Sequence, residues 1–261
     1  YPKGLLDVYV IADNCTDETA RIAREAGARV YERENQTQRG KGYALDYFFH
    51  HLSMDGRDDY DGYFVFDADN LIDPDFTAEM NKTFDTGKYD VAWKEVMDEG
   101  GFSAPYGLTT AERRHPEFRT HGVGKCEWDG AIWPFASAQT LTAMANFMNR
   151  SAQSVLTDSI YFHQMERYVE SQYHRGRPYI GEYLDEVTGY WLKGDQERSR
   201  YYNHSTFNDL IITGLVGLRP RADHTVEVNP LLPDGRWDWF CLDNLLYHGH
   251  YLTILWDKYG D

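Results

Sequence analysis

The residue pattern of this 261-residue chain changes abruptly near residue 90. Before that point, short β-branched and aromatic runs alternate with amphipathic helical segments, which is typical of βαβ units around a parallel sheet. From Ala92 onward, long helical stretches are separated by Gly- and Pro-rich loops, and the C-terminal segment favours strands. The join at residues 90–94 contains no flexible linker. We therefore expect two domains: an α/β part over residues 1–90, and a mainly α-helical part with terminal β-strands over residues 91–261.

The first of these parts contains three strand-like runs, each followed by a helical segment. The expected strands are Val8–Ala12, Arg29–Tyr31 and Tyr63–Phe66, and the expected helices follow Thr16, span Tyr43–Leu52 and begin at Pro74. Gly27 is placed to end the first helix, and Pro is favoured at a first helical position because its missing N–H is not needed there. The pattern predicts a partial parallel sheet with helical crossovers.

The second part has three apolar stretches of helical period. One face of the first carries Leu141, Met144, Ala145 and Met148. One face of the second carries Leu156, Ile160, His163 and Met165 through Val169, and the third stretch covers residues 205–218. The third is almost wholly apolar, so we expect it to be buried. Strands are expected at Thr225–Val228 and His250–Leu255.

Composition excludes several classes of function. The formal charge of −16 repels the phosphate backbone of nucleic acids, so a nucleic-acid partner is not expected. No stretch reaches the ~20 apolar residues of a membrane helix. Three widely spaced Cys residues (Cys15, Cys126 and Cys241) form no CxxC pair, so we expect reducing, cytoplasmic surroundings. The 20 Tyr and seven Trp supply flat faces that suit sugar rings, although large aromatics also fill cores.

A candidate metal site follows the expected strand at Tyr63–Phe66. Asp67 and Asp69 stand two positions apart at its carboxyl end, where a parallel sheet presents its ligand crevice. Hard divalent cations take oxygen ligands, so the pair suggests Mg²⁺ or Mn²⁺ bridging the phosphates of a nucleotide sugar. Acidic pairs after strands also serve as helix caps or solvated turns.

Three blocks, in order, surround this pair. They are Asp13-Asn14-Cys15-Thr16-Asp17-Glu18-Thr19, Arg39-Gly40-Lys41-Gly42-Tyr43-Ala44-Leu45 and Phe64-Val65-Phe66-Asp67-Ala68-Asp69-Asn70. Together they resemble the nucleotide-binding half of GT-A glycosyltransferases of family 2, over about residues 5–90. The resemblance implies that Asp13 contacts the nucleotide, that Lys41 and Gly42 lie by the diphosphate, and that Asp67 and Asp69 carry the metal. A basic helix start in solvent is the alternative for Arg39–Gly42.

Two features of that family are missing from the chain. Its first strand should precede Tyr1, and the acid that deprotonates the acceptor hydroxyl should lie near residue 100, where the sequence does not match. We therefore expect this part to bind a nucleotide diphosphate without transferring the sugar.

The second part carries loops rich in Trp, Gly and carboxylates between its helices. The main blocks are Phe102–Pro116, Cys126-Glu127-Trp128-Asp129-Gly130-Ala131-Ile132-Trp133-Pro134-Phe135, Gly181-Glu182-Tyr183-Leu184-Asp185-Glu186-Val187-Thr188-Gly189 and Tyr201–Thr206. These blocks resemble the C-terminal part of glycoside hydrolases with an (α/α)6 barrel, of the mannosylglycerate-hydrolase-like and family 63 kind, over about residues 92–258. The resemblance implies a partial toroid of helices around a sugar cleft.

Relatives of this kind invert configuration with two carboxyl groups. Glu182 matches the place of their general base, which deprotonates the attacking water. Acid and base in inverting enzymes stand ~6.5–9.5 Å apart to leave room for that water. The matching acid belongs to an earlier part of the barrel that this chain lacks, so Asp129 or Glu112 would have to substitute. A hydrogen-bonding loop residue is the favoured alternative for Asp129.

Other residues of the second part have two interpretations each. Trp128 and Trp133 suit either a sugar platform or core packing, and His204 either a hydrogen bond to substrate or a structural one. His248 and His250 alternate on one strand face and suggest a metal only with a third ligand, which the sequence does not show nearby. Glu186 is expected in a solvated turn.

Three hypotheses follow for the whole chain. The favoured one is a glycoside hydrolase fused to a nucleotide-sugar-binding segment, acting on an oligosaccharide or glycoside without a cofactor. The alternatives are a family 2-like glycosyltransferase that uses a nucleotide sugar and a divalent metal, and a joined fragment that binds carbohydrate without turnover. Because a partial toroid leaves apolar helix faces uncovered, we also expect a homodimer or poor solubility.

Overall fold

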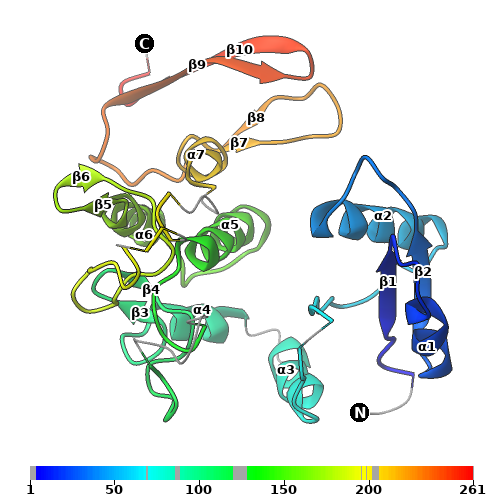
Figure 1. The fold of residues 1–261 in the computed structure, drawn as a ribbon. Helices are drawn as coiled ribbons and strands as arrows, with labels where there is room; N and C mark the ends of the chain where they lie inside the picture. Colours follow the sequence, from blue (N-terminus) through cyan, green and yellow to red (C-terminus); the bar gives the residue numbers. More distant parts are fainter. Residues whose placement is uncertain are drawn as a thin grey trace. The chain divides into compact units, whose positions relative to one another are not determined.

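The computed structural model describes residues 4–68, 70–85, 89–119, 128–194, 196–197, 199–201 and 206–260. The chain forms two compact units, residues Tyr1–Lys88 and Tyr89–Asp261 (Figure 1). Each unit has buried side chains of its own.

A parallel strand pair with a helical crossover forms the centre of the first unit. β1 (Tyr9–Asp13) pairs in parallel with β2 (Arg29–Arg33), and α1 (Thr19–Glu25) connects them. Asp17 caps this turn by accepting a hydrogen bond from the Thr19 backbone N–H at 3.0 Å. The predicted βαβ unit is therefore present.

The second helix of this unit, α2 (Lys41–Met54), covers the strand pair with its apolar face. The ring of Phe48 lies 5.2 Å from that of Tyr9 and 5.4 Å from that of Tyr31, both edge-on. Leu52, one turn further, is fully buried. Aromatic pairs at these separations add to the stability that burial itself gives.

The expected third strand at Tyr63–Phe66 is wrong. These residues pair with no strand, and α3 (Phe76–Asp85) follows them. Phe64 and Phe66 contact the ring of Phe76 in α3 at 5.2 and 5.3 Å, so local aromatic packing occupies the side chains that a sheet would have buried. Within the described residues, the parallel sheet of this unit therefore has two strands and extends no further toward a GT-A sheet.

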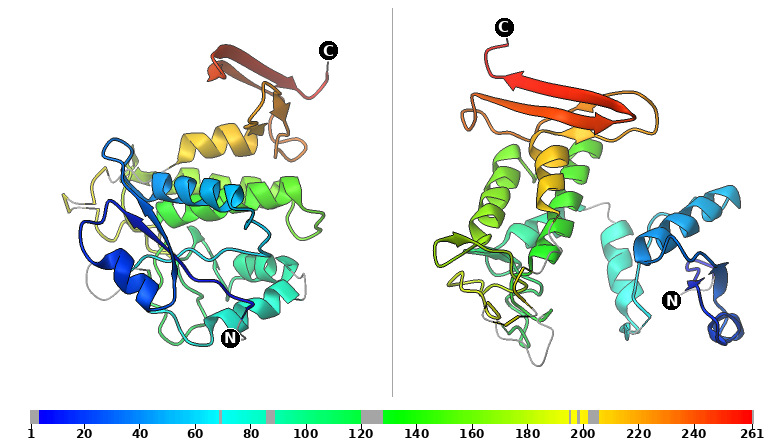
Figure 2. Two further views of the ribbon diagram at one scale, coloured as in Figure 1. Left: turned by 90° about the vertical axis from the view of Figure 1, so that its right-hand side faces the viewer. Right: turned by 45° about the horizontal axis from the view of Figure 1, so that its top comes forward.

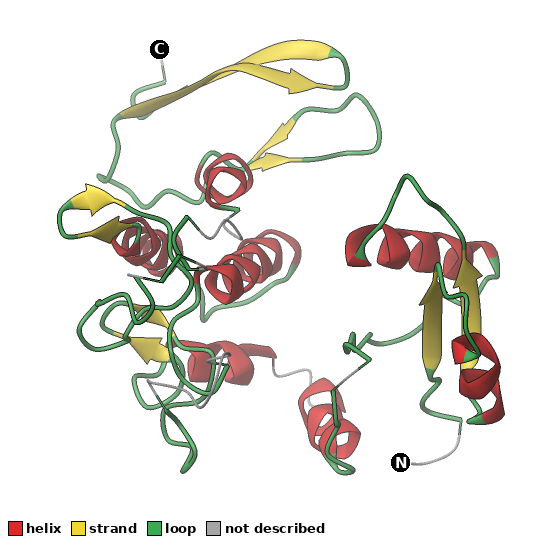
Figure 3. Cartoon of the chain, viewed as in Figure 1, coloured by secondary structure: helices red, strands yellow, loops and turns green. Residues whose placement is uncertain are grey.

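Helices form the core of the second unit (Figures 2 and 3). They are α4 (Tyr89–Met97), α5 (Pro134–Arg150), α6 (Asp158–Ser171) and α7 (Phe207–Leu210), which continues into the π-helical η1 (Ile211–Leu215). α5 contacts α6, α7 and η1. The buried cluster between them contains Leu141, Met144, Ala145, Met165, Leu210 and Leu215. The face predicted for α5 from Leu141, Met144 and Ala145 is the one that faces this core. The face predicted for α6 is wrong in part, because His163 and Val169 are exposed while Tyr161, Phe162 and Tyr168 are buried beside Met165.

The π-helical turn packs closely against α6. The Oη atom of Tyr161 in α6 reaches the backbone at Gly214 so closely that a Cβ there would stand 2.0 Å from it. Burial raises the pKa of the Tyr161 hydroxyl. Gly214, the fourth residue of the π-helical turn Ile211–Leu215, therefore leaves no room for a larger side chain.

Short strand pairs and one long hairpin complete the unit. The pairs are β3 (Ser103–Ala104) with β4 (Gly107–Leu108), β5 (Tyr173–His174) with β6 (Arg177–Pro178), and β7 (Leu218–Arg219) with β8 (Glu227–Val228). β9 (Trp239–Tyr247) pairs antiparallel with β10 (His250–Asp257). The terminal β-strands are thus confirmed, whereas the helices of the described residues do not close a toroid.

None of the helices in the described ranges has both the length and the apolar character needed to cross a bilayer.

The helical core predicts a sharp contrast between two positions of α6. Met165 is 1% exposed and Val169 is 40% exposed. Met165→Ala should lower the free energy of unfolding by about 2–5 kcal/mol through lost burial and a cavity, whereas Val169→Ala should change it by less than about 1 kcal/mol. All seven Trp lie beyond residue 88, so urea unfolding followed by Trp fluorescence reports on this unit. Equal losses in the two variants would contradict the assigned core.

Candidate active site

Two loops of the second unit are held together by a reciprocal backbone pair. The Ile132 N–H donates to the Leu184 carbonyl and the Leu184 N–H to the Ile132 carbonyl, both at 2.9 Å. Leu184 also bridges to Trp191, and Ile132 to Thr109. Ile132, Leu184 and Trp191 are buried together. The segment leading into α5 is therefore fixed beside the segment that carries Glu182.

Glu182 lies inside this arrangement and is 1% exposed. Its backbone N–H donates to Ser199 Oγ at 3.2 Å, and Ser199 is itself fully buried. The preceding residue, Gly181, abuts Trp191 so closely that a Cβ would stand 2.4 Å from the indole ring. The sequence around Glu182 thus places this residue in the interior of the second unit, and the residue before it packs on an aromatic ring.

Tyr183, the residue after Glu182, belongs to an aromatic cluster. The ring of Trp133 lies 5.2 Å from Tyr183 and 4.5 Å from Trp128, the latter edge-on. Lys193 Nζ stands 4.7 Å from the Tyr183 ring centre. Trp133 is 8% exposed and Trp128 is 49% exposed. Trp133 is therefore a core residue here, while Trp128 offers an open ring surface next to it.

Asp129 follows Trp128 on the same loop. Its backbone carbonyl accepts from the Arg119 N–H at 2.8 Å, while its Oδ1 is buried without a hydrogen-bond partner among the described residues. Antiparallel chains run in opposite directions, so Asp129, which precedes Ile132, and Glu182, which precedes Leu184, lie on opposite sides of the bridge. The bridge does not by itself bring these two carboxyl groups together.

Glu112 lies in a different cluster. Arg114 Nε donates to Glu112 Oε1 at 2.9 Å, and the same guanidinium also pairs with Glu95 and Asp98. Three carboxylates around one Arg form a surface ion-pair network, and Glu112 is already paired within it. His204 lies outside the described residues, so its role stays a prediction.

Sequence reasoning missed the burial of Glu186. It was expected in a solvated turn, but it is 4% exposed, and its backbone carbonyl accepts from the Tyr106 N–H at 3.3 Å. In the turn around it, Asp185 Oδ1 accepts hydrogen bonds from the N–H groups of Val187 and Thr188. Tyr183, Lys193 and Ser199 were also not singled out, since their importance comes from contacts between distant segments.

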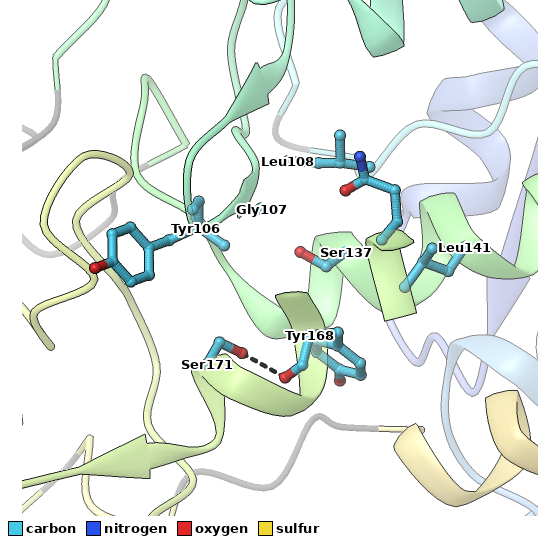
Figure 4. Close-up of a pocket in the computed structure, with 9 residues that line it drawn as sticks. Tyr106, Gly107, Leu108, Ser137, Leu141, Tyr168 and Ser171 are labelled. Atoms are coloured by element: carbon cyan, nitrogen blue, oxygen red, sulfur yellow. Dashed lines mark hydrogen bonds between the residues drawn. The ribbon is translucent and has the colours of Figure 1, made fainter. Parts of the chain in front are cut away.

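A small cavity lies close to these loops, between β4, α5 and α6 (Figure 4). It is lined by Ile132 and Leu141 and by the polar side chains of Ser137, Gln164 and Ser171. The space open to the centre of a water molecule is ≈ 10 Å³, which corresponds to about one water. Ser171 Oγ donates to the Tyr168 carbonyl at 2.7 Å, while Ser137 Oγ has no partner within the described part of the chain. The cavity suits a single structural water.

The residues expected at a nucleotide lie in the first unit. Asp13 pairs with the buried guanidinium of Arg33 at 2.6 Å, and Lys41 Nζ pairs with Asp67 Oδ1 at 2.7 Å, with both of the latter side chains more than half exposed. Gly42 is exposed on α2. Asp69 lies outside the described residues, so the predicted Asp67–Asp69 metal pair stays a prediction.

A divalent cation at the predicted site of the first unit would need several oxygen ligands close together. Among all described residues, no three His, Cys, Asp or Glu side chains are arranged as a ready metal site. The described donor set at the predicted position is the Asp67 carboxylate, which already pairs with an ammonium group. Because Asp69, the second predicted ligand, lies outside the described residues, binding of Mg²⁺ or Mn²⁺ there stays a prediction.

Comparison with known families decides the class of this chain. The mannosylglycerate hydrolase MGH1-like glycoside hydrolase domain matches residues 13–205. The chain belongs to this glycoside hydrolase family. The match begins in the first unit and ends in the second. It contains Glu182, Asp129, Trp128 and Trp133.

Two further findings complete the comparison. The C-terminal domain of glycosyl hydrolase family 65 matches residues 218–260, which hold the terminal hairpin. A solved structure named "Sialidase" is 86% identical, with a TM-score of 0.64, and the match covers 67% of this chain. This chain spans 16% of that protein's length. The glycoside hydrolase resemblance is thus confirmed, and neither of the two matching families is a glycosyltransferase.

Close packing against the backbone of Arg119 makes Gly130 sensitive to substitution. A Cβ at Gly130 would stand 2.1 Å from the Arg119 carbonyl oxygen, whereas one at Gly42 meets no atom within 4 Å. Gly130→Ala should therefore lower the stability of the second unit by about 1–3 kcal/mol. Gly42→Ala should leave the unfolding transition seen by Trp fluorescence unchanged, since it lies in the Trp-free unit. An unchanged midpoint in Gly130→Ala would show that the loop is not packed as described.

Proposed function

We propose that residues 128–135 and 181–193 form the base-bearing side of a glycoside hydrolase site. The observation that carries the proposal is the burial of Glu182, which stands next in sequence to Tyr183, whose ring lies 5.2 Å from that of Trp133. Carboxyl groups are rarely buried so completely without a specific reason. Because the chain belongs to a glycoside hydrolase family, we propose that the reason is a role in glycoside hydrolysis.

Glu182 acts in this proposal as the general base of an inverting reaction. Its carboxylate takes a proton from water, the water oxygen bonds to the anomeric carbon, and the glycosidic C–O bond breaks. A second carboxyl group must protonate the leaving oxygen. Asp129, whose buried Oδ1 has no hydrogen-bond partner among the described residues, is kept as the candidate for that acid within this chain, although the Ile132–Leu184 bridge does not by itself bring it to Glu182.

Trp128 provides the sugar-binding surface in the same proposal. It is held edge-on by Trp133, so its ring has a fixed orientation while half of its surface faces solvent. A flat apolar face of this kind suits the C–H face of a pyranose ring. Trp133 then acts as support for Trp128 and not as a platform.

A second candidate function is binding of carbohydrate without turnover. The same burial that marks Glu182 also keeps its carboxyl group from solvent in this structure. A base that acts on water has to be reached by water, so the closed form favours binding over hydrolysis.

Hydrolysis assays with the purified chain separate the two candidates. The substrates are mannosylglycerate and a sialoside, which follow the names of the family and of the similar structure, and α-glucosides as a further class. If the first candidate holds, native protein releases sugar and Glu182→Gln lowers the rate by about 10²–10⁴-fold, the usual contribution of a general base. Glu197→Gln, an exposed acid, serves as the control.

The outcomes of this assay are distinct. Activity that survives Glu182→Gln in a folded protein would refute the assignment of the base. An inactive native chain that still binds an oligosaccharide in calorimetry would establish the second candidate.

The first unit supports a separate proposal, binding of a nucleotide diphosphate with a divalent metal. It rests on the contact between Lys41 and Asp67, which brings an ammonium for phosphate and a carboxylate for a metal to one place. Calorimetry with UDP and Mn²⁺ should show metal-dependent binding that Asp67→Asn weakens about tenfold or more. Asp61→Asn, an exposed acid of the same unit, is the control. Absence of metal-dependent binding would remove this proposal.

A further inference from the structure

A second cavity of the second unit lies where two turns meet, between the β7–β8 loop and the tip of the β9–β10 hairpin (Figure 1). It is lined by His224, Val226, Tyr247, His248, His250 and Leu252. Its volume of ≈ 220 Å³ is below the ~300–1,000 Å³ of pockets that hold drug-sized ligands. The cavity therefore suits a small ligand, of the size of a single ring.

The backbone around this cavity is fixed by hydrogen bonds between the two turns. The hairpin turn places His248 and Gly249 at φ +47° and +81°, as a two-residue type I′ turn requires. Tyr247 Oη accepts from the Arg221 N–H at 3.1 Å and donates to the Thr225 carbonyl at 2.9 Å, so it ties the β7–β8 loop to the hairpin. The cavity is therefore formed before any ligand binds.

Three imidazole rings give the cavity its polar groups. The ring centre of His224 lies 5.5 Å from that of His248 and 6.3 Å from that of His250, at interplanar angles of 67° and 74°. Rings that meet at such angles do not stack on one another, and all three residues are exposed. Their nitrogens are therefore open to a ligand.

The hydrogen bonds of these rings leave several nitrogens available. His248 Nε2 lies 2.9 Å from the Arg221 carbonyl oxygen, which can only accept, so we assign the proton to Nε2 and a lone pair to Nδ1. Within the described residues, no hydrogen bond engages the rings of His224 and His250. A neutral imidazole offers one donor and one acceptor, which is what a hydroxyl group needs from its partners.

The rest of the lining is apolar. Val226 is 46% exposed, and Leu252 is partly buried beside it in the lining. Small-molecule sites typically combine an apolar lining with a few placed polar groups. A ligand with an apolar face and hydroxyl groups at its edge matches this combination.

Two other classes of ligand fit less well. The lining histidines are not arranged as a metal site in the described part of the chain. Arg221, the one Lys or Arg of residues 220–226, already pairs with Glu227 at 3.0 Å, and Asp223 adds a carboxylate to the same loop. Together with the net charge of −16, this disfavours an anion. A neutral polyhydroxyl ligand is left.

We propose that this cavity binds one pyranose unit of a carbohydrate. All six lining residues lie in residues 218–260, which match the C-terminal domain of glycosyl hydrolase family 65, so a sugar is a ligand that such a chain meets. The apolar face of the pyranose lies against Val226 and Leu252, and its hydroxyl groups bond to the imidazole nitrogens. The site uses none of the residues assigned to hydrolysis and does not depend on the proposed activity of Glu182.

NMR of the full chain tests the proposal, with methyl α-mannoside and methyl α-glucoside as probes. The ring C–H signals of His224, His248 and His250 should shift in a saturable manner, with a dissociation constant of about 1 mM. His163, an exposed histidine of α6, is the matched control and should not shift. Because these signals report on the cavity alone, they should respond in the same way in Glu182→Gln, whatever becomes of hydrolysis.

Two variants locate the binding. His224→Ala and His250→Ala should each weaken binding at the cavity about five- to tenfold, since each removes hydrogen bonds to the sugar, while His163→Ala should bind as the native chain does. Sugar binding in calorimetry that His224→Ala leaves intact belongs to the loops of Trp128 and Glu182 instead.

Three results would overturn the proposal. They are the absence of a saturable shift with either sugar, saturable shifts with inorganic phosphate but not with sugar, and an equal loss of affinity in His163→Ala.

Discussion

The reciprocal hydrogen bonds between Ile132 and Leu184 are the constraint on which the candidate site depends. They join two segments about fifty residues apart in the sequence, and they do so in buried surroundings, where leaving a backbone group unpaired costs about 1–3 kcal/mol. Their antiparallel direction brings Tyr183 beside Trp133 at the start of α5. The bridge thus fixes the segment that carries Glu182 beside the segment that carries Trp128 and Trp133.

Local patterns predicted the helices well because each pattern requires only nearby residues. The apolar spacing of Leu141, Met144 and Ala145 identified the buried face of α5, and Gly27, at φ +95°, ends the first helix region as predicted. The prediction of a strand at Tyr63–Phe66 was wrong because β-branched and aromatic content does not show whether a neighbouring strand is available for pairing. The rings of Phe64 and Phe66 contact Phe76 instead.

The site was predictable only in part. The resemblance to glycoside hydrolases identified Glu182, and the family match confirmed the class. The buried state of Glu186, the support that Trp133 gives to Trp128, and the approach of His224 to His248 all arise from contacts between distant segments. No spacing along the chain encodes such contacts. Asp69 and His204 lie outside the described residues. The metal pair of the first unit and the substrate contact of His204 therefore stay predictions.

The central claim is that the Trp128 loop and the Glu182 loop form one carbohydrate-binding surface. Hydrogen–deuterium exchange of the full chain, with and without an α-mannosyl oligosaccharide, tests it most directly. The account predicts slower exchange of the backbone amides in residues 128–135 and 181–193 together when the sugar is present. Unchanged exchange in both loops, or protection confined to another part of the chain, would contradict the account.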